Sequence, residues 1–90
     1  MIVKQFIITA SEGLHARPAS SLVGAVSSFN SDVNLTFNEK TVNLKSILGV
    51  MSLGIPANSV ISISANGLDE GAVFEKIEDV IATIGLGKLC

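Results

Sequence analysis

The residues best suited to chemistry are the only histidine and the only arginine of the chain, His15 and Arg17. They stand in residues 13–19, Gly-Leu-His-Ala-Arg-Pro-Ala, where a loop leads into apolar residues at helical spacing. Pro18 suits the first turn of a helix, because its missing N–H would have no intrahelical partner there. His15 and Arg17 therefore fall at a helix N-terminus, beside free backbone N–H groups and the positive end of the helix dipole. A nucleophile, a cation and an anion-binding helix end together predict a site for a phosphoryl group.

The predicted site would use the imidazole of His15 as its nucleophile, which requires a neutral ring with a free nitrogen lone pair. Arg17 and the helix end both disfavour another positive charge, so both favour that neutral ring. After transfer, the backbone N–H groups of Ala16 and Arg17 can bond the phosphoryl oxygens, and the guanidinium adds a charge-assisted contact. The helix end contributes ~0.3–2 kcal/mol, enough to orient the group without trapping it. The alternative, a surface or helix-capping histidine, is disfavoured by the neighbouring Arg17, Pro18 and Gly13.

The chain lacks the sequence motifs of nucleotide-using enzymes. It contains no GxxxxGK[ST] loop and no set of kinase motifs. We therefore expect a phosphoryl carrier and not an enzyme, one that receives the group from one protein and passes it to another. Zinc sites need several His and Cys ligands, whereas this chain has one of each, His15 and Cys90, far apart in sequence. We expect no metal and no cofactor.

Composition indicates a small folded protein. Its 90 residues, 48% hydrophobic and 16% charged, suffice for one domain, residues 1–90, with a modest core, and they argue against disorder. The net charge of −2 provides no basic surface for nucleic acid. No apolar run approaches the ~20 residues that cross a bilayer, and the first residues show no secretion signal. We expect a cytoplasmic protein that neither inserts into membranes nor binds nucleic acid, with Cys90 an incidental thiol.

The pattern of apolar residues predicts the element order β-α-β-β-α-β-α. Strands are indicated by β-branched residues and by alternation, as at Val33, Leu35 and Phe37, and helices by apolar residues three or four apart. Ser46 and Asp69 are expected to cap the second and third helices. Each readable strand has one polar face, which favours a single antiparallel sheet with helices on one side, an α+β fold. The expected strands are residues 2–8, 32–37, 40–43 and 60–65, and the expected helices are residues 16–28, 47–52 and 70–84.

Two segments of the chain resemble the HPr family, the histidine-containing phosphocarriers of the bacterial phosphoenolpyruvate:sugar phosphotransferase system. They are residues 13–19 and residues 41–54, Thr-Val-Asn-Leu-Lys-Ser-Ile-Leu-Gly-Val-Met-Ser-Leu-Gly, and the resemblance extends over essentially the whole chain. It implies an open-faced β-sandwich in which three helices cover one face of four antiparallel strands. It also implies that enzyme I phosphorylates His15 at Nδ1 with the assistance of Arg17, and that IIA domains of sugar permeases receive the group.

Residues 45–47, Lys-Ser-Ile, are similar to the regulatory serine site of HPr proteins from low-GC Gram-positive bacteria. By that resemblance, an HPr kinase/phosphorylase would modify Ser46 with ATP as part of carbon catabolite repression. A phosphate is electrostatically favourable at a helix N-terminus, so Ser46 can serve both as a cap and as a modification site. The added dianion would hinder the acidic partners that phosphorylate His15, and it would present a new surface to an Arg-bearing catabolite-control transcription regulator.

The short helix at residues 47–52 also predicts a docking surface. A helix of this length cannot easily turn all of its apolar side chains inward, so we expect Ile47 and Leu48 to be partly exposed beside His15. Some relatives carry lysines on the docking face of the first helix, where this chain has serine and glycine, so attraction of acidic partners would rest mainly on Arg17 and Lys45. The complete set of predicted docking residues is Ser20, Gly24, Ser27, Lys45, Ile47, Leu48 and Met51.

Two alternative functions compete with this interpretation. A regulatory HPr paralogue would act mainly through Ser46 and would lack the active histidine, so His15 counts against it. The other alternative is a ligand- or RNA-binding α/β sandwich of similar strand order. RNA recognition would require aromatic residues exposed on the sheet, whereas this chain has no Tyr and no Trp. We therefore expect a monomeric phosphocarrier.

Overall fold

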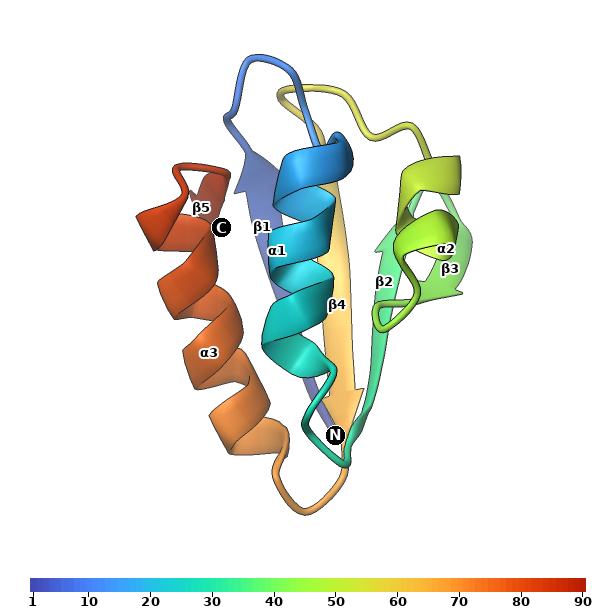
Figure 1. Ribbon diagram of the computed structural model, residues 1–90, viewed down its shortest axis with the longest axis vertical. Helices are drawn as coiled ribbons and strands as arrows, with labels where there is room; N and C mark the ends of the chain where they lie inside the picture. Colours follow the sequence, from blue (N-terminus) through green and yellow to red (C-terminus); the bar gives the residue numbers. More distant parts are fainter.

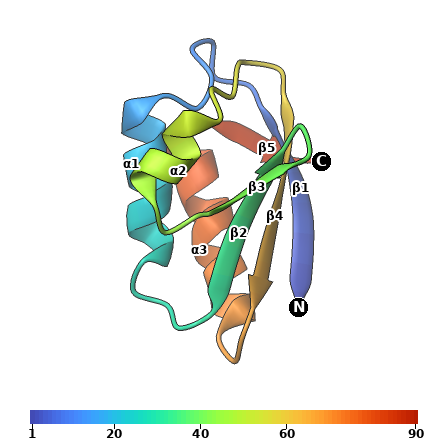
Figure 2. The ribbon, with the colours of Figure 1, turned by 90° about the vertical axis from the view of Figure 1, so that its right-hand side faces the viewer.

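The computed structural model describes residues 1–90 and shows three helices against one face of an antiparallel sheet (Figures 1 and 2). The sheet has five strands in the order β3-β2-β4-β1-β5. Its other face is open, and the N-terminal end of α1 lies at the opposite end of the molecule from the N-terminal end of α3 (Figure 1). The elements are β1 (Ile2–Ile8), α1 (Ala16–Val26), β2 (Asp32–Phe37), β3 (Lys40–Asn43), α2 (Ile47–Ser52), β4 (Val60–Asn66), α3 (Glu70–Thr83) and β5 (Gly87–Leu89).

The strand pattern read from the sequence is confirmed in β4, the central strand. Ile61, Ile63 and Ala65 are buried under the helices, whereas Ser62 and Ser64 lie on the open face. This alternation follows from the period of two in a strand. The buried side chains of all layers form one cluster of 20 residues, so a single core supports both ends of the molecule.

The sheet has one strand more than the four expected. β5 pairs antiparallel with β1, with Gly87 opposite Ile8 and Leu89 opposite Phe6. A side chain on Gly87 would collide with the Ile7 carbonyl group, so a glycine allows this close approach. Three residues are too few to display a readable alternation, and for that reason the strand is invisible in the sequence pattern.

The predicted N-cap residue of α3, Asp69, is confirmed in its position but not in a capping side-chain contact. Asp69 occupies the N-cap position of α3, but its side chain makes no capping hydrogen bond. Its carboxylate instead accepts the backbone N–H groups of Asn30 (2.8 Å) and Ser31 (2.9 Å) and the hydroxyl group of Ser31. The Ser31 hydroxyl, followed by the Asn30 N–H, lowers the pKa of Asp69 below its ordinary value. Asp69 therefore joins the α1–β2 loop to the start of α3.

The helices differ little from expectation. α1 ends at Val26, two residues before the expected end at residue 28, and the Ser27 hydroxyl donates to the Gly24 carbonyl (3.2 Å). Such a local bond competes with continuation of the helix. None of the three helices has the length and apolar character needed to span a membrane.

Candidate functional site

His15 occupies the N-cap position of α1, with an extended backbone (φ −90°, ψ −166°). Its side chain makes no capping hydrogen bond, so the imidazole is not used to satisfy the helix end. The first helical hydrogen bond runs from the Ala19 amide to the His15 carbonyl (3.0 Å). The N–H groups of Ala16 and Arg17 precede that bond and remain at the open end of the helix, as predicted from the position of Pro18.

The loop before α1 holds His15 at the surface by anchoring its neighbours. Gly13 adopts a positive φ of 72°, and a side chain there would collide with the Ile55 carbonyl group. The Leu14 amide donates to that same carbonyl (3.0 Å), and the Leu14 side chain is buried in the core. His15 comes directly after this anchor and keeps 44% of its side chain exposed. The loop thus fixes the backbone of His15 while leaving the ring accessible.

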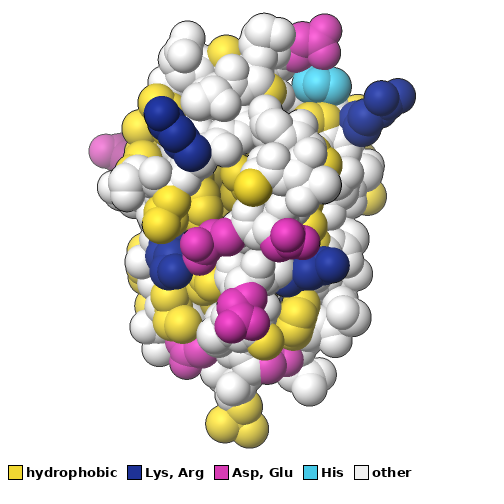
Figure 3. Space-filling view, turned by 90° about the vertical axis from the view of Figure 1, so that its left-hand side faces the viewer, with side chains coloured by type: hydrophobic (Ala, Val, Ile, Leu, Met, Phe, Trp, Pro, Cys, Tyr) yellow, Lys and Arg dark blue, Asp and Glu magenta, His cyan; other side chains and the backbone are white.

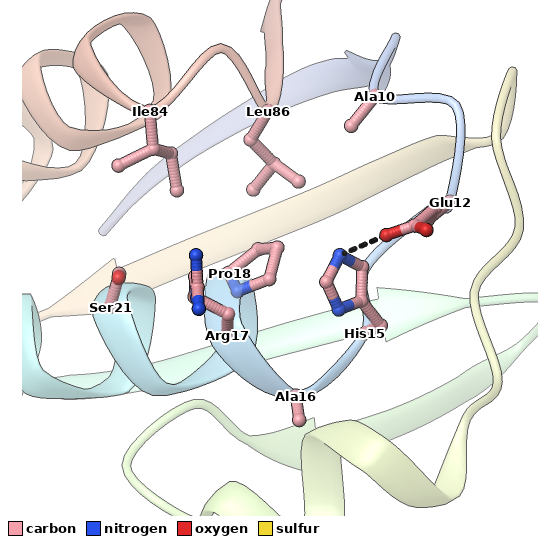
Figure 4. Close-up of a pocket in the computed structure, with 9 residues that line it drawn as sticks. All are labelled: Ala10, Glu12, His15, Ala16, Arg17, Pro18, Ser21, Ile84 and Leu86. Atoms are coloured by element: carbon pink, nitrogen blue, oxygen red, sulfur yellow. Dashed lines mark ion pairs between the residues drawn. The ribbon is translucent and has the colours of Figure 1, made fainter.

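A cavity of about 640 Å³ lies beside the histidine (Figure 4). His15 and Arg17 both border it, so the structure brings together the two residues that the sequence singled out. The only ionisable groups in its lining are Glu12, His15 and Arg17. The complete lining is Ala10, Glu12, His15, Ala16, Arg17, Pro18, Ser21, Ile84 and Leu86.

Glu12 is the residue of this site that the sequence analysis missed. Its Oε2 atom lies 3.1 Å from Nε2 of His15, and its side chain is 77% exposed (Figure 4). Figure 3 shows the same contact at the surface, with an acidic side chain directly against the one histidine. An ionised carboxylate only accepts hydrogen bonds, so this contact favours the form of the ring that has a hydrogen on Nε2. In the neutral ring the lone pair is then on Nδ1.

Ser46 caps α2, as predicted. Its Oγ atom accepts the backbone N–H of Gly49 (3.1 Å), and the residue is exposed. In the six-residue helix that follows, Val50 is the buried side chain. Ile47, Leu48 and Met51 are 42%, 84% and 41% exposed, so the expected apolar surface is present on α2.

The other predicted docking residues differ in solvent exposure and in the bonds they make. Ser20, Gly24 and Ser27 are exposed on or directly after α1. Lys45 is half-buried, and its ammonium group donates to the Phe29 carbonyl just beyond the end of α1 (2.7 Å). A cation near a helix C-terminus is stabilising, so Lys45 holds the β3–α2 connection against α1. Arg17 makes no such bond and borders the same cavity as His15.

The chain was compared with known protein families and solved structures. Residues 2–83 match the family model described as the PTS HPr component phosphorylation site. The chain belongs to the HPr family. It is similar to a histidine-containing phosphocarrier protein from Mycoplasma, with 38% identity over 96% of this chain and 98% of the other, and a TM-score of 0.93. It is also similar to the phosphocarrier protein HPr of Bacillus anthracis, with 35% identity over 88% and 94% of the two chains and a TM-score of 0.80.

One similar structure is an HPr-like protein with a different name and role. The catabolite repression HPr of Bacillus subtilis, Crh, is 38% identical over 81% of this chain and 84% of its own, with a TM-score of 0.70, and that protein forms a swapped dimer. HPr phosphocarriers of Gram-positive bacteria and their paralogue therefore share this fold. The α+β fold expected from the resemblance is confirmed, with β5 as the one added strand.

Proposed function

We propose that this HPr-family chain carries a phosphoryl group on Nδ1 of His15, taking it from enzyme I and giving it to IIA domains of sugar permeases. The observation that carries the proposal is the position of His15 at the open N-terminal end of α1, where it borders a cavity together with Arg17 and contacts Glu12 through Nε2. Figure 4 shows the other ring nitrogen turned toward the first turn of α1, where the N–H groups of Ala16 and Arg17 are open.

The transfer uses groups that are already present at the site. The Nδ1 lone pair attacks phosphorus, a P–N bond forms, and the bond from phosphorus to the donor breaks with its electron pair returning to the donor. The N–H groups of Ala16 and Arg17 and the guanidinium of Arg17 then bond the phosphoryl oxygens. Transfer to the acceptor reverses the process, and the electron pair of the P–N bond returns to Nδ1. Proper positioning of these donors supplies the protein's share of the chemistry.

The exposed residues of α1 and α2 provide the proposed docking surface. The exposed apolar residues of α2, Ile47, Leu48 and Met51, form one part, and Ser20, Gly24 and Ser27 of α1 form the other. Exposed apolar groups rimmed by polar residues are typical of protein–protein contact sites. We propose transient docking of a monomer in the cytoplasm, with Arg17 supplying the charge that attracts acidic partners and Lys45 acting mainly to support α2.

We further propose that Ser46 is a regulatory site for HPr kinase/phosphorylase and, when phosphorylated, for a catabolite-control transcription regulator. Its hydroxyl group is exposed at a helix start, where a phosphate is electrostatically favourable. The likeness to Crh supports a second candidate, a paralogue acting mainly through Ser46. His15, with its open helix end and the cavity beside it, supports the carrier.

Incubation with enzyme I and phosphoenolpyruvate tests the carrier function. The wild-type chain should gain one acid-labile, alkali-stable phosphate, the behaviour of a P–N bond. His15→Ala should gain none, and Ser46→Ala should be labelled like the wild type. Labelling of His15→Ala to the wild-type level would contradict the proposal.

Incubation with ATP and HPr kinase/phosphorylase tests the regulatory site. The wild type and His15→Ala should both gain an acid-stable phosphate, and Ser46→Ala should not. If the phosphorylated Ser46 form still accepts phosphate from enzyme I at the unmodified rate, the proposed regulation is wrong.

A further inference from the structure

We propose that Glu12 is a positioning residue that holds the Nε2 hydrogen of His15 before, during and after phosphoryl transfer. The inference rests on the proposed function of His15 and extends it to a residue outside the helix. Glu12 precedes His15 by three residues in the β1–α1 loop, and its Oε2 atom lies 3.1 Å from Nε2. Because this contact occupies the ring nitrogen away from α1, it selects Nδ1 as the nucleophile.

The β1–α1 loop holds the backbone of Glu12 and His15 in a fixed arrangement. Gly13 and Leu14, the two residues between the partners, are held by the tight approach to Ile55 and by the burial of Leu14. Glu12 and His15 therefore stand on a fixed piece of backbone, although both side chains are open to solvent. A positioned partner of a reactive imidazole is the usual means of setting its tautomer.

Glu12 has a second effect after transfer, because the Nε2 hydrogen stays on the phosphorylated ring. When neutral His15 attacks through Nδ1, the Nε2 hydrogen stays in place, so the phosphorylated ring carries a positive charge. The Glu12 carboxylate stabilises that charge, whereas loss of the hydrogen to water would leave a neutral and more persistent phosphohistidine. A P–N bond breaks more readily when the ring is protonated, because the departing ring leaves as a neutral imidazole. Glu12 thus keeps the phosphoryl group in its transferable form.

The charges around the ring are few. Besides Glu12, the cavity lining contains only Arg17 as a charged side chain, and the connection between α3 and β5 contributes the apolar Ile84 and Leu86. The N-terminal end of α1 adds its partial positive charge on the Nδ1 side. Glu12 is therefore the single anionic side chain in the lining of this cavity.

Two substitutions separate the two effects of Glu12. Glu12→Gln keeps a carbonyl oxygen that can accept the Nε2 hydrogen but removes the negative charge, and Glu12→Ala removes both. Glu75→Gln is the matched control, because Glu75 is an exposed glutamate on α3, whose N-terminal half lies at the opposite end of the molecule from the β1–α1 loop (Figure 1). The 77% exposure of Glu12 means that these variants remove no core packing.

The tautomer is measured by ¹⁵N NMR of the unphosphorylated proteins, at a pH where the ring ¹⁵N shifts no longer change with pH. In Glu12→Ala the ratio of the Nε2–H form to the Nδ1–H form should fall about two- to fivefold, the range for an exposed charged contact. Glu12→Gln and Glu75→Gln should keep a ratio close to that of the wild type. An unchanged ratio in Glu12→Ala would overturn the inference.

The stability of the phosphorylated ring is measured as the rate of phosphate loss at about pH 7 after labelling by enzyme I. Glu12→Gln and Glu12→Ala should both lose phosphate about two- to fivefold more slowly than the wild type and Glu75→Gln. Equal rates in all four proteins would overturn the effect of the charge. If the wild type and Glu75→Gln accept no phosphate at all, the proposed function itself has failed, and the ¹⁵N measurement still tests the tautomer.

Discussion

The N-terminal ends of α1 and α2 differ in whether the N-cap side chain accepts a hydrogen bond from the helix. At α2, the Ser46 hydroxyl accepts the Gly49 amide, so the helix end is satisfied from within the chain. At α1, the His15 side chain caps nothing, and the first turn contains no acidic residue. A satisfied end stabilises a helix, whereas an open end beside a nucleophile and a guanidinium leaves its N–H groups available for an anion from outside.

The difference explains how one small fold could hold the two proposed phosphorylation sites, which are of different kinds. A phosphate on His15 would fill donors that are otherwise unused, on a nitrogen from which it can be passed on. A phosphate on Ser46 would instead replace a cap that already exists, as a stable ester on the proposed docking surface. The first position suits transfer and the second suits regulation.

Removal of the cation at α1 should have the largest effect among the variants that spare His15. Arg17→Met should slow phosphorylation by enzyme I about ten- to a hundredfold, because a hydrogen bond to a charged group contributes ~1.5–3 kcal/mol. The initial rate of labelling from phosphoenolpyruvate measures this effect. Lys40→Met, which removes an exposed lysine of β3, is the matched control and should label like the wild type. Equal rates for the two variants would show that α1 needs no guanidinium.

Removal of the cap at α2 should affect stability and leave transfer unchanged. Ser46→Ala should lower the free energy of unfolding by about 1 kcal/mol, the usual cost of losing an N-cap side chain. Urea denaturation measures this change, and the rate of His15 labelling should stay at the wild-type value. Ser28→Ala, at an exposed serine beyond the end of α1, is the control for loss of a hydroxyl group. A slower labelling rate in unmodified Ser46→Ala would break the distinction between the two ends.

The N-terminal end of α3 differs from both. Its N-cap residue, Asp69, uses its carboxylate to bind the α1–β2 loop instead of capping the helix. The Ser31 hydroxyl and the Asn30 amide lower the pKa of Asp69, so its contribution to stability is complete above the ordinary carboxyl value of about 4. That contribution should be lost as the pH falls through the lowered pKa. Denaturation of the wild type and Asp69→Asn from pH 7 downward measures it. The stability difference should shrink on acidification, and a difference independent of pH would contradict this role.

Local signals made most of the fold and the centre of the site predictable. The Ser46 cap is predictable because capping depends on residues three apart, and the place of His15 and Arg17 at a helix start is predictable because they adjoin Pro18. What the sequence could not show depends on distant partners. The Asp69 carboxylate accepts hydrogen bonds from Ser31, 38 residues away, and the Lys45 ammonium group donates to the Phe29 carbonyl, 16 residues away.

Two further features were not predicted: the contact between Glu12 and His15, which are close in sequence, and the strand β5, which follows the predicted helix α3. Glu12 lies three residues before His15, but only a loop bent at Gly13 brings their side chains together. β5 depends on the fit of Gly87 against Ile7, which no pattern of apolar residues records. Periodicity describes faces of regular elements, so contacts made by loops and short edges fall outside it.

The central claim, that the open end of α1 serves a phosphoryl group on Nδ1 of His15, is tested most directly by locating the phosphate on the ring. Phosphoenolpyruvate and enzyme I would be used to phosphorylate ¹⁵N-labelled protein, and ³¹P–¹⁵N couplings would identify the bonded nitrogen. We predict a single phosphate on Nδ1, with altered amide signals at Ala16 and Arg17. A phosphate on Nε2, or on any residue other than His15, would contradict the account.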